Sequence, residues 1–405
     1  MRIHPFRALR PIPERAAALS VPPYDVVTTE EARTLAQGVP DSFFWVTRPD
    51  IALPEGEAAP PERQHETARQ ALNRLIRQGI LVREEVPVYF LYRLIRKGRA
   101  QRGVVACFET ADYGTLIRRH EKTRPDKEED RQRHMAALRT HDEPVFLLCR
   151  DRSDFTAFCD QQEQAAPLYD FTASDGVRHT LWPVREPDRL APILERIPCA
   201  YIADGHHRAA AAVRVAEETF PPSAPVDPVE QRRFLAVLFP ASELEILPYH
   251  RLVRDLRGMT EKQFLEALRQ QVSVEAAAGP AADRPGQCSL FLAGRWYTLR
   301  FRPPSEADPC ASLDVQMLQD QVLGPILGIE NPRTDPRIAF VGGIKGEGEL
   351  VRRVEAGEAA AAFAMAPVTV QQLMAIADAG RTLPPKSTWF EPKLRSGLFL
   401  HPFFP

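Results

Sequence analysis

Apolar residues recur along the chain with two different periods, and the two periods alternate. Residues 65–78 carry alanine, leucine and isoleucine at helical spacing and are followed by Gly79, which predicts a helix that ends there. Residues 86–93 and 103–109 are short apolar runs on either side of an exposed turn at 97–99, so they predict a β-hairpin. Alternation of strands and helices predicts a mixed α/β fold.

The same periods predict the other elements of the first 250 residues. Further short apolar runs predict strands at 42–47, 145–149, 179–184, 199–203 and 234–239. Helical spacing predicts helices at 127–139, 155–164 and 208–218.

The pattern of apolar and polar residues changes after residue 251. The later part predicts a helix at 261–271, a hairpin of 288–293 with 296–301, an amphipathic helix at 313–327, a buried run at 359–364 and a helix at 370–379. One hydrophobic core rarely serves 405 residues. We therefore expect an N-terminal α/β region at 1–258 and an additional C-terminal α+β region at 259–405, whose tail could pack on the first.

Composition limits the classes of function. Net charge is −2, so the basic excess that DNA-binding proteins usually show is missing and a nucleic-acid partner is disfavoured. No run of about 18 apolar residues predicts a membrane span. The N-terminus lacks the apolar core of a signal peptide, and the six cysteines form no C-x-x-C pair. We expect a cytoplasmic protein with reduced thiols and no zinc site.

The most distinctive chemical pattern is Asp204-Gly205-His206-His207-Arg208, between a predicted strand and a predicted helix. A strand that turns through glycine into a helix leaves backbone N–H groups free at the helix start, and these groups favour an anion. We expect Asp204 to cap the helix. Three cationic or potentially cationic side chains in the first turn oppose the helix dipole, so they favour a bound phosphate.

Two other interpretations of this turn stay open. It could be an ordinary strand-to-helix turn with two surface histidines. It could also hold a metal, although adjacent histidines at a helix start point in different directions, unlike a pair four residues apart.

A second charged group of residues runs from His120 to Arg131. Glu121 lies among basic side chains, so it should stay ionised and could accept a proton from an attacking hydroxyl. Lys127 and Arg131 are four residues apart and share one helix face. The alternative is a solvated charged loop and helix. Lys386 lies in a third group, beside hydroxyl and aromatic residues in a proline-rich segment that could line a pocket or pack as a tail.

Five segments together resemble the domain-of-unknown-function family number 1015 of bacteria and archaea. They are residues 22–27, the His120-Glu121-x-Thr123 stretch with Lys127 and Arg131, residues 204–208, residues 247–251 and residues 385–388. That family name carries no established chemistry. The D-G-H-H-R turn also resembles the phosphate-binding turn of the ParB and sulfiredoxin-like group, which includes free serine kinases. Those enzymes use a nucleotide to phosphorylate the hydroxyl of free L-serine.

The second resemblance implies a ParB/sulfiredoxin-like mixed-sheet core with a nucleotide, ATP or ADP with Mg²⁺, at the turn. The predicted function is a nucleotide-dependent phosphotransferase that acts on a small hydroxyl-bearing metabolite such as free serine. We assign nucleotide binding to Gly205, His206, His207 and Arg208, and catalysis to Glu121, Asp204 and His207. We assign substrate binding to His120, Thr123, Lys127, Arg131 and Lys386.

Two functions of other classes are the alternatives. The first is a ParB-like nucleotide-gated regulator without catalysis, which near-neutral charge and the lack of a DNA-reading helix disfavour. The second is thiol chemistry, which is disfavoured because histidine occupies the turn where a cysteine would be needed and Cys199 lies in the preceding strand.

Overall fold

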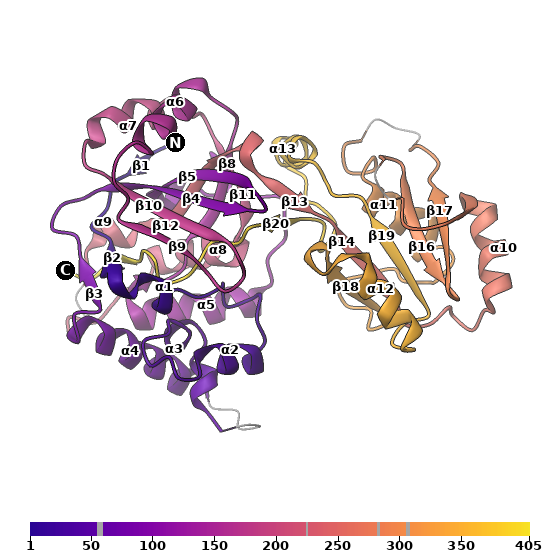
Figure 1. Ribbon diagram of the computed structural model, residues 1–405, viewed down its shortest axis with the longest axis horizontal. Helices are drawn as coiled ribbons and strands as arrows, with labels where there is room; N and C mark the ends of the chain where they lie inside the picture. The colour runs from indigo at the N-terminus through magenta and orange to yellow at the C-terminus, as the bar shows by residue number, and fades with distance from the viewer. Residues whose placement is uncertain (55–59, 224–225, 282–283, 305–307) are drawn as a thin grey trace. The chain divides into compact units, whose positions relative to one another are not determined.

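The computed structural model describes residues 1–54, 60–223, 226–281, 284–304 and 308–405 (Figure 1). The chain divides into two compact units. Unit 1 consists of Met1–Leu244 together with Pro392–Pro405, and unit 2 consists of Glu245–Glu391. Residue 258, where the sequence predicts a domain boundary, lies inside unit 2.

Unit 1 is built on a mixed sheet with the strand order β6-β11-β8-β12-β5-β4-β10-β9 and with β1 paired to β5. Its strands are β1 (Ile3–His4), β4 (Tyr89–Arg96), β5 (Arg99–Glu109), β6 (Ile117–Arg118), β8 (Val145–Cys149), β9 (Tyr169–Thr172), β10 (Arg178–Val184), β11 (Ala200–Asp204) and β12 (Arg233–Pro240). The predicted hairpin is confirmed as the antiparallel pair β4–β5.

Unit 1 also contains helices. They are α1 (Ala16–Leu19), α2 (Thr29–Ala36), α3 (Phe44–Thr47), α4 (Pro61–Arg77), α5 (Pro125–Leu138), α6 (Ser153–Gln162), α7 (Pro187–Glu195), α8 (His206–Ala216) and α9 (Pro228–Gln231). In Figure 1, α6 and α7 lie at one edge of unit 1 and α2 to α5 at the opposite edge. One hydrophobic cluster joins alternate residues of the strands to Phe155 of α6, Leu190 of α7 and Ala209 of α8. Because alternate strand residues share a face, these helices bury one face of the sheet.

Unit 2 contains a second sheet with the order β15-β17-β16-β19-β14-β18. Its strands are β14 (Tyr249–Val253), β15 (Ser273–Ala277), β16 (Gln287–Leu292), β17 (Arg295–Arg300), β18 (Ile338–Gly342) and β19 (Ala361–Met365), and β13 (Glu245–Leu247) pairs with β20 (Trp389–Glu391). Its helices are α10 (Glu261–Gln271), α11 (Asp314–Leu318), α12 (Gly346–Glu355) and α13 (Val370–Asp378). The predicted mixed α/β fold with an additional C-terminal α+β region is confirmed.

We call Pro392–Pro405 the return segment, because it follows unit 2 in the sequence and belongs to unit 1. In Figure 1 its yellow ribbon passes among the indigo and magenta elements. Ser396 exchanges backbone hydrogen bonds with Val21, and Leu400 does so with Leu9. β21 (His401–Pro402) pairs with β7 (Thr140–His141), while β2 (Leu9–Pro11) pairs with β3 (Leu81–Arg83). The return segment is therefore part of the core of unit 1.

Two predicted elements are wrong. The sequence predicts a buried strand at 42–47, but Phe44–Thr47 is the short helix α3, with Phe43, Phe44 and Val46 buried. A short apolar run buries equally well in either conformation, so its pattern does not separate them. The helix expected at 313–327 is α-helical only as far as Leu318 and continues as a π-helix over Gln319–Leu323.

No helix among the described residues has both the length and the apolar character needed to cross a membrane.

Candidate functional site at the start of α8

Sheet order brings three loops of unit 1 to one place. β6 and β11 are parallel neighbours, so the loop that follows β6, with His120 and Glu121, leaves the sheet beside the turn that follows β11. β8 is antiparallel to β11 and pairs Phe146 with Asp204, so the residues before β8 lie there as well. Loops at the carboxyl ends of parallel strands commonly form binding sites.

The turn itself depends on Gly205. Gly205 has φ +89°, in the left-handed region, and is the N-cap residue of α8. A Cβ atom at this position would lie 2.9 Å from Nε of Arg208, so a side chain would also collide with the guanidinium. The turn therefore requires glycine on two separate grounds.

The expectation that Asp204 caps the helix is wrong, because α8 has no side-chain cap. The Asp204 carboxylate instead lies 3.5 Å from Nη2 of Arg208 and 3.2 Å from Nζ of Lys393. Despite its burial, these two cations hold its pKa well below the usual range. Within the described part of the chain, no side chain therefore caps the first backbone N–H groups of α8.

Arg208 is buried rather than displayed on the surface. Its side chain is 3% exposed, and its Nη1 donates a hydrogen bond to the carbonyl of Pro144. Its Nε is buried and has no hydrogen-bond partner among the described residues. A buried cation with an unused donor favours an additional acceptor.

His206 and His120 form a buried pair beside Arg208. Their ring centroids are 4.5 Å apart in an edge-to-face contact. Burial is the main cause that lowers the pKa of His206 to about 3; Asp204 opposes this shift and Arg208 adds to it, so the ring is neutral. Nε2 of His206 has no hydrogen-bond partner among the described residues.

His120 is also neutral, because burial and the neighbouring His206 lower its pKa well below the ordinary value. Neither of its ring nitrogens makes a hydrogen bond of normal geometry to a described residue. The backbone of Ile202 nevertheless lies close enough to favour a proton on the ring. The described contacts of the His120 ring are thus the edge-to-face pair with His206 and the backbone of Ile202.

Glu121 and His207 lie on the more open side of the turn. Oε2 of Glu121 is 3.9 Å from Nδ1 of His206, and the Glu121 side chain is 34% exposed. Nε2 of His207 accepts a hydrogen bond of 3.1 Å from the backbone N–H of Arg124. The structure therefore brings Glu121, His120 and the turn close together.

The other predicted substrate-binding residues are placed differently. Thr123 donates its hydroxyl hydrogen bond to Glu128, and Lys127 is exposed on α5. Arg131 is buried, pairs with Asp130 at 2.9 Å and lies 4.2 Å from the ring centroid of Tyr24. Lys386 belongs to unit 2, where its Nζ lies 5.6 Å from the ring centroid of Tyr249.

Sequence reasoning missed a buried carboxylate next to the turn. Oε1 of Glu143 accepts hydrogen bonds from the backbone N–H of Tyr24 at 3.1 Å and from Oγ of Ser396 at 2.5 Å. Burial raises the pKa of Glu143 to about 7, although Arg208 opposes the rise. Glu143 thereby ties residues from three distant parts of the chain together, and only the folded topology reveals this role.

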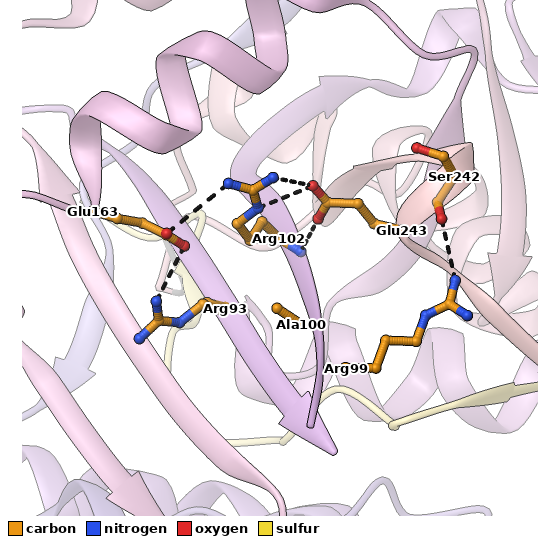
Figure 2. Close-up of a pocket in the computed structure, with 7 residues that line it drawn as sticks. All are labelled: Arg93, Arg99, Ala100, Arg102, Glu163, Ser242 and Glu243. Carbon is orange, nitrogen blue, oxygen red and sulfur yellow. Dashed lines mark hydrogen bonds and ion pairs between the residues drawn. The ribbon is translucent and has the colours of Figure 1, made fainter. Parts of the chain in front are cut away.

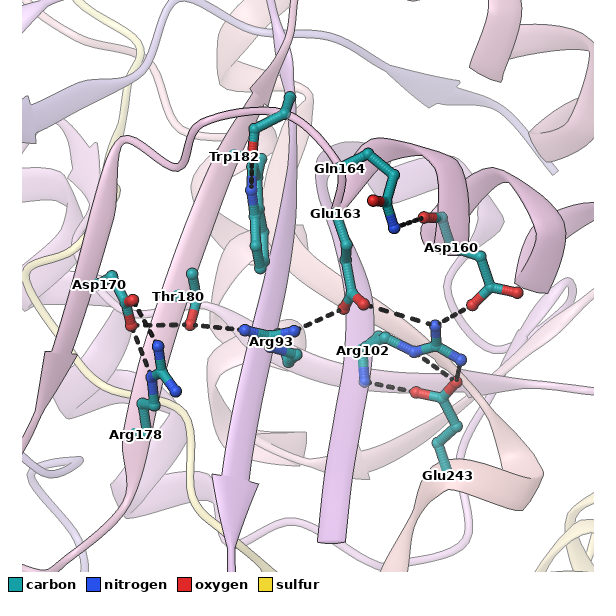
Figure 3. Close-up of polar contacts among 11 residues, drawn as sticks. Arg93, Arg102, Asp160, Glu163, Gln164, Asp170, Arg178, Thr180, Trp182 and Glu243 are labelled. Atoms are coloured by element: carbon teal, nitrogen blue, oxygen red, sulfur yellow. Dashed lines mark hydrogen bonds and ion pairs between the residues drawn. The ribbon is translucent and has the colours of Figure 1, made fainter. Parts of the chain in front are cut away.

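A second polar cluster lines a cavity of about 480 Å³ elsewhere in unit 1, and Figure 2 shows its lining. Arg102 donates from Nε and Nη2 to Oε1 of Glu243 at 2.9 and 2.6 Å, and its Nη1 pairs with Asp160. Figure 3 shows how Glu163 links Arg102 to Arg93. Carboxylates balance most of the arginine charge here, so we interpret the cluster as a network that fastens α6 and residues 241–243 to the sheet.

Several solved structures resemble the chain in part. Free serine kinase in complex with AMP is 12% identical, with 73% of this chain and 92% of that chain covered and a TM-score of 0.38. A conserved hypothetical protein from Pyrococcus furiosus is 13% identical, with coverages of 73% and 95% and a TM-score of 0.37. SbnI with a C-terminal truncation from Staphylococcus aureus is 10% identical, with coverages of 72% and 85% and a TM-score of 0.39.

No curated protein matches the sequence. A family model does match, over residues 3–316, which is well over half of the 405 residues. The matched range contains the turn at the start of α8 and every other candidate residue except Lys386. The chain therefore belongs to the family described as "Protein of unknown function (DUF1015)".

Proposed function

We propose that this protein is a nucleotide-dependent phosphotransferase that acts on a small hydroxyl-bearing metabolite such as free serine. One observation carries the proposal. The uncapped start of α8 lies beside two buried nitrogen atoms that have no hydrogen-bond partner among the described residues, Nε2 of His206 and Nε of Arg208. Buried donors normally find acceptors, so this arrangement calls for a ligand rich in acceptor oxygens.

A phosphate group has the required chemistry. It carries several acceptor oxygens and a negative charge, which the free N–H groups and the dipole at a helix start attract. Neutral His206 can donate one hydrogen bond, and the charged Arg208 can donate a stronger one. That a nucleotide supplies this phosphate is inferred from the resemblance of the D-G-H-H-R turn to that of free serine kinases.

Phosphoryl transfer needs an oriented acceptor hydroxyl as well as bound phosphate. Glu121 is a partly exposed carboxylate 3.9 Å from His206, so it lies beside the phosphate position and is open to a substrate. In the proposal it accepts the hydroxyl proton while His206 and Arg208 hold the phosphate oxygens. Because the His206 ring is neutral, it can form a hydrogen bond with the Glu121 carboxylate but not an ion pair.

A magnesium ion at a nucleotide site is usually held by phosphate oxygens and water with one or two carboxylates. No group of three histidine, cysteine, aspartate or glutamate residues that could hold a metal occurs in the part of the chain that the structure describes. Asp204, the carboxylate of the turn itself, is paired with Lys393 and Arg208. We therefore assign no step of the reaction to a magnesium ion bound by protein side chains.

Calorimetric titration of the full chain with ATP, ADP and CTP in magnesium buffer tests the proposal. Arg208→Met should weaken binding roughly 10-fold or more, because a hydrogen bond from a charged donor is lost. Arg214→Met, on the same helix with a 41% exposed side chain, is the matched control and should bind within about two-fold of wild type. Thermal melts of both variants would show that they are folded.

The reaction is tested next by incubating the protein with the bound nucleotide and serine or related hydroxy acids. Phosphorus NMR should show a new phosphate monoester, and Glu121→Gln should suppress it without loss of nucleotide affinity. If folded wild-type protein binds none of the nucleotides, the proposed function is wrong.

A further inference from the structure

Unit 2 carries a charged turn that the function proposed for unit 1 does not use. We call residues 384–388, Pro-Pro-Lys-Ser-Thr, the lysine turn. Lys386 is exposed and has φ +53°, in the left-handed region that favours glycine. Oγ of Ser387 donates a hydrogen bond of 2.7 Å to the carbonyl of Pro384, which closes the turn. The neighbours of Lys386 therefore hold it in a conformation that lysine disfavours.

Two successive backbone N–H groups of the lysine turn are available to an acceptor. The N–H groups of Lys386 and Ser387 make no backbone hydrogen bond within the described residues. The Ser387 hydroxyl serves the turn itself, so it does not satisfy either group. Successive N–H groups in turns of this kind form concave sites that bind anions. The backbone of the lysine turn is therefore suited to a negatively charged group.

A buried arginine is attached to the lysine turn. Arg251 of β14 is 3% exposed, and its Nη2 donates a long hydrogen bond of 3.4 Å to the carbonyl of Pro385. Its Nη1 donates to the carbonyl of Tyr249. Both acceptors are uncharged, and within the described residues no carboxylate forms an ion pair with Arg251. Burial lowers the pKa of Arg251 to about 10, so the guanidinium still carries its charge at neutral pH.

The charge around the lysine turn is positive. Nζ of Lys386 lies 5.6 Å from the ring centroid of Tyr249, and in the described part of unit 2 it forms no ion pair with a carboxylate. The Cys288 thiol acts on Arg251, but burial raises the pKa of this thiol, so it is uncharged at neutral pH. Asp314 acts on Cys288 and is not among the groups that shift Arg251. Two cations, one buried and one exposed, thus lie at the turn without a carboxylate partner.

We propose that the lysine turn binds a phosphate group of the kind found in a phosphate monoester. The ammonium group of Lys386 and the N–H groups of Lys386 and Ser387 contact the phosphate oxygens. Arg251 adds its charge from the buried side and holds the turn at Pro385. A phosphate monoester carries a charge of about −1.5 to −2 at pH 7, which matches two cations better than one carboxylate does.

This inference concerns residues of unit 2 and does not depend on the function proposed for unit 1. The competing explanation is that Arg251 and Lys386 only fasten the turn to β14. That explanation predicts a loss of stability on substitution and no binding of phosphate.

The test measures the binding of inorganic phosphate and of acetate to the full chain by calorimetric titration. Lys386→Met should weaken phosphate binding about 10-fold or more, because a charged hydrogen bond is lost. Lys386→Arg keeps the charge and should stay within about three-fold of wild type. Both variants place an L side chain at the same positive φ, so their backbone costs are equal. Lys262→Met, an exposed residue of α10, is the control and should bind like wild type.

The same titrations with Arg208→Met separate this site from the start of α8. Phosphate binding that persists with Arg208→Met, weakens with Lys386→Met and returns with Lys386→Arg supports the inference. Phosphate binding that is lost with Arg208→Met and unchanged with Lys386→Met belongs to the start of α8. That result overturns the inference and leaves the proposed function standing.

Three further results would also overturn the inference. Equal affinities for acetate and phosphate would show that the turn does not select a phosphate group. Equal weakening in both Lys386 variants, with a lower melting temperature before phosphate is added, would show a structural role. Wild-type protein that binds no phosphate would exclude the site, and the nucleotide titrations would then decide the proposed function separately.

Discussion

Several histidines of unit 1 are kept neutral by burial. The pKa values of His141, His179 and His206 are each lowered to about 3, with burial as the largest cause. In the unfolded chain the same side chains have a pKa near 6.5. Below that pH the unfolded state binds more protons than the folded state, so acid favours unfolding.

We predict that the free energy of unfolding falls as pH drops from about 6.5 toward 4. Each such histidine adds about 1.4 kcal/mol per pH unit to the slope. His179→Asn keeps an acceptor for the Tyr92 hydroxyl, which lies 2.7 Å from Nδ1 of His179, but it does not titrate. Urea unfolding at several pH values should therefore show a smaller slope for this variant. An unchanged slope would mean that His179 is protonated in the folded protein.

Glu143 acts in the opposite direction. Its pKa is about 7 in the folded protein, against about 4.3 in an unfolded chain, so the folded state binds the extra proton between these values. Its contribution to stability is present at low pH and is lost as pH rises through about 7.

We predict that Glu143→Gln becomes more stable relative to wild type as pH rises from 5 to 9. The amide oxygen can still accept from Tyr24 and Ser396, and it never ionises. The relative change should be roughly 1–3 kcal/mol, measured by urea unfolding of both proteins at each pH. A constant difference across this range would show that Glu143 does not titrate there.

Single residues also mark the limit of what the sequence reveals. The D-G-H-H-R turn stands out because its charges make little sense for helix stability. Lys393 and Glu143 carry no such local signal, since each gains its meaning from a partner far away in the sequence. Arg131 shows the opposite problem. On a polar helix a cation is expected to be exposed, but the Arg131 side chain is buried in the fold.

At the scale of elements, β11, Gly205 and α8 form one continuous strand–turn–helix motif. The strand ends at Asp204, the glycine adopts its left-handed conformation, and the helix begins at His206. The sequence predicts this strand and helix to within two residues, because apolar runs and a glycine mark both boundaries. It fails at residues 42–47, where α3 and a strand would bury the same aromatic side chains.

We predict that Gly205→Ala destabilises the protein by about 1–3 kcal/mol and also weakens ADP binding. An alanine would be strained at φ +89° and would push Arg208 away from its present position. Gly114→Ala is the matched control, since Gly114 has φ +78° but nothing within 4 Å of the added Cβ. It should show the conformational cost alone and unchanged ADP affinity. Equal ADP affinity in the two variants would contradict the predicted displacement of Arg208.

At the scale of the whole molecule, unit 1 is discontinuous in sequence. Leu398, Phe399 and Leu400 of the return segment are fully buried, and Leu400 joins a core cluster with Leu9 and residues of α1 to α4. Sequence periodicity does not predict this arrangement, because the return segment forms no long helix or strand and so carries no periodic apolar pattern.

We predict that Leu400→Ala lowers the free energy of unfolding by about 2–5 kcal/mol, since it leaves a cavity in the core of unit 1. Leu35→Ala is the control, because Leu35 of α2 is 47% exposed and its loss should cost about 0.5 kcal/mol or less. Urea unfolding followed by circular dichroism measures both. Similar values for the two variants would show that the return segment contributes little to stability.

The discontinuity of unit 1 has a consequence for synthesis on the ribosome. Domains usually fold in the order in which they are translated. Here the segment that completes unit 1 is translated after all of unit 2. Unit 2, residues 245–391, is therefore fully synthesised before unit 1 and can fold before it. Until then, the surfaces of unit 1 that the return segment covers stay open to water. A chaperone that binds exposed apolar chain would therefore meet the nascent N-terminal part for longer than a contiguous domain of equal size would require.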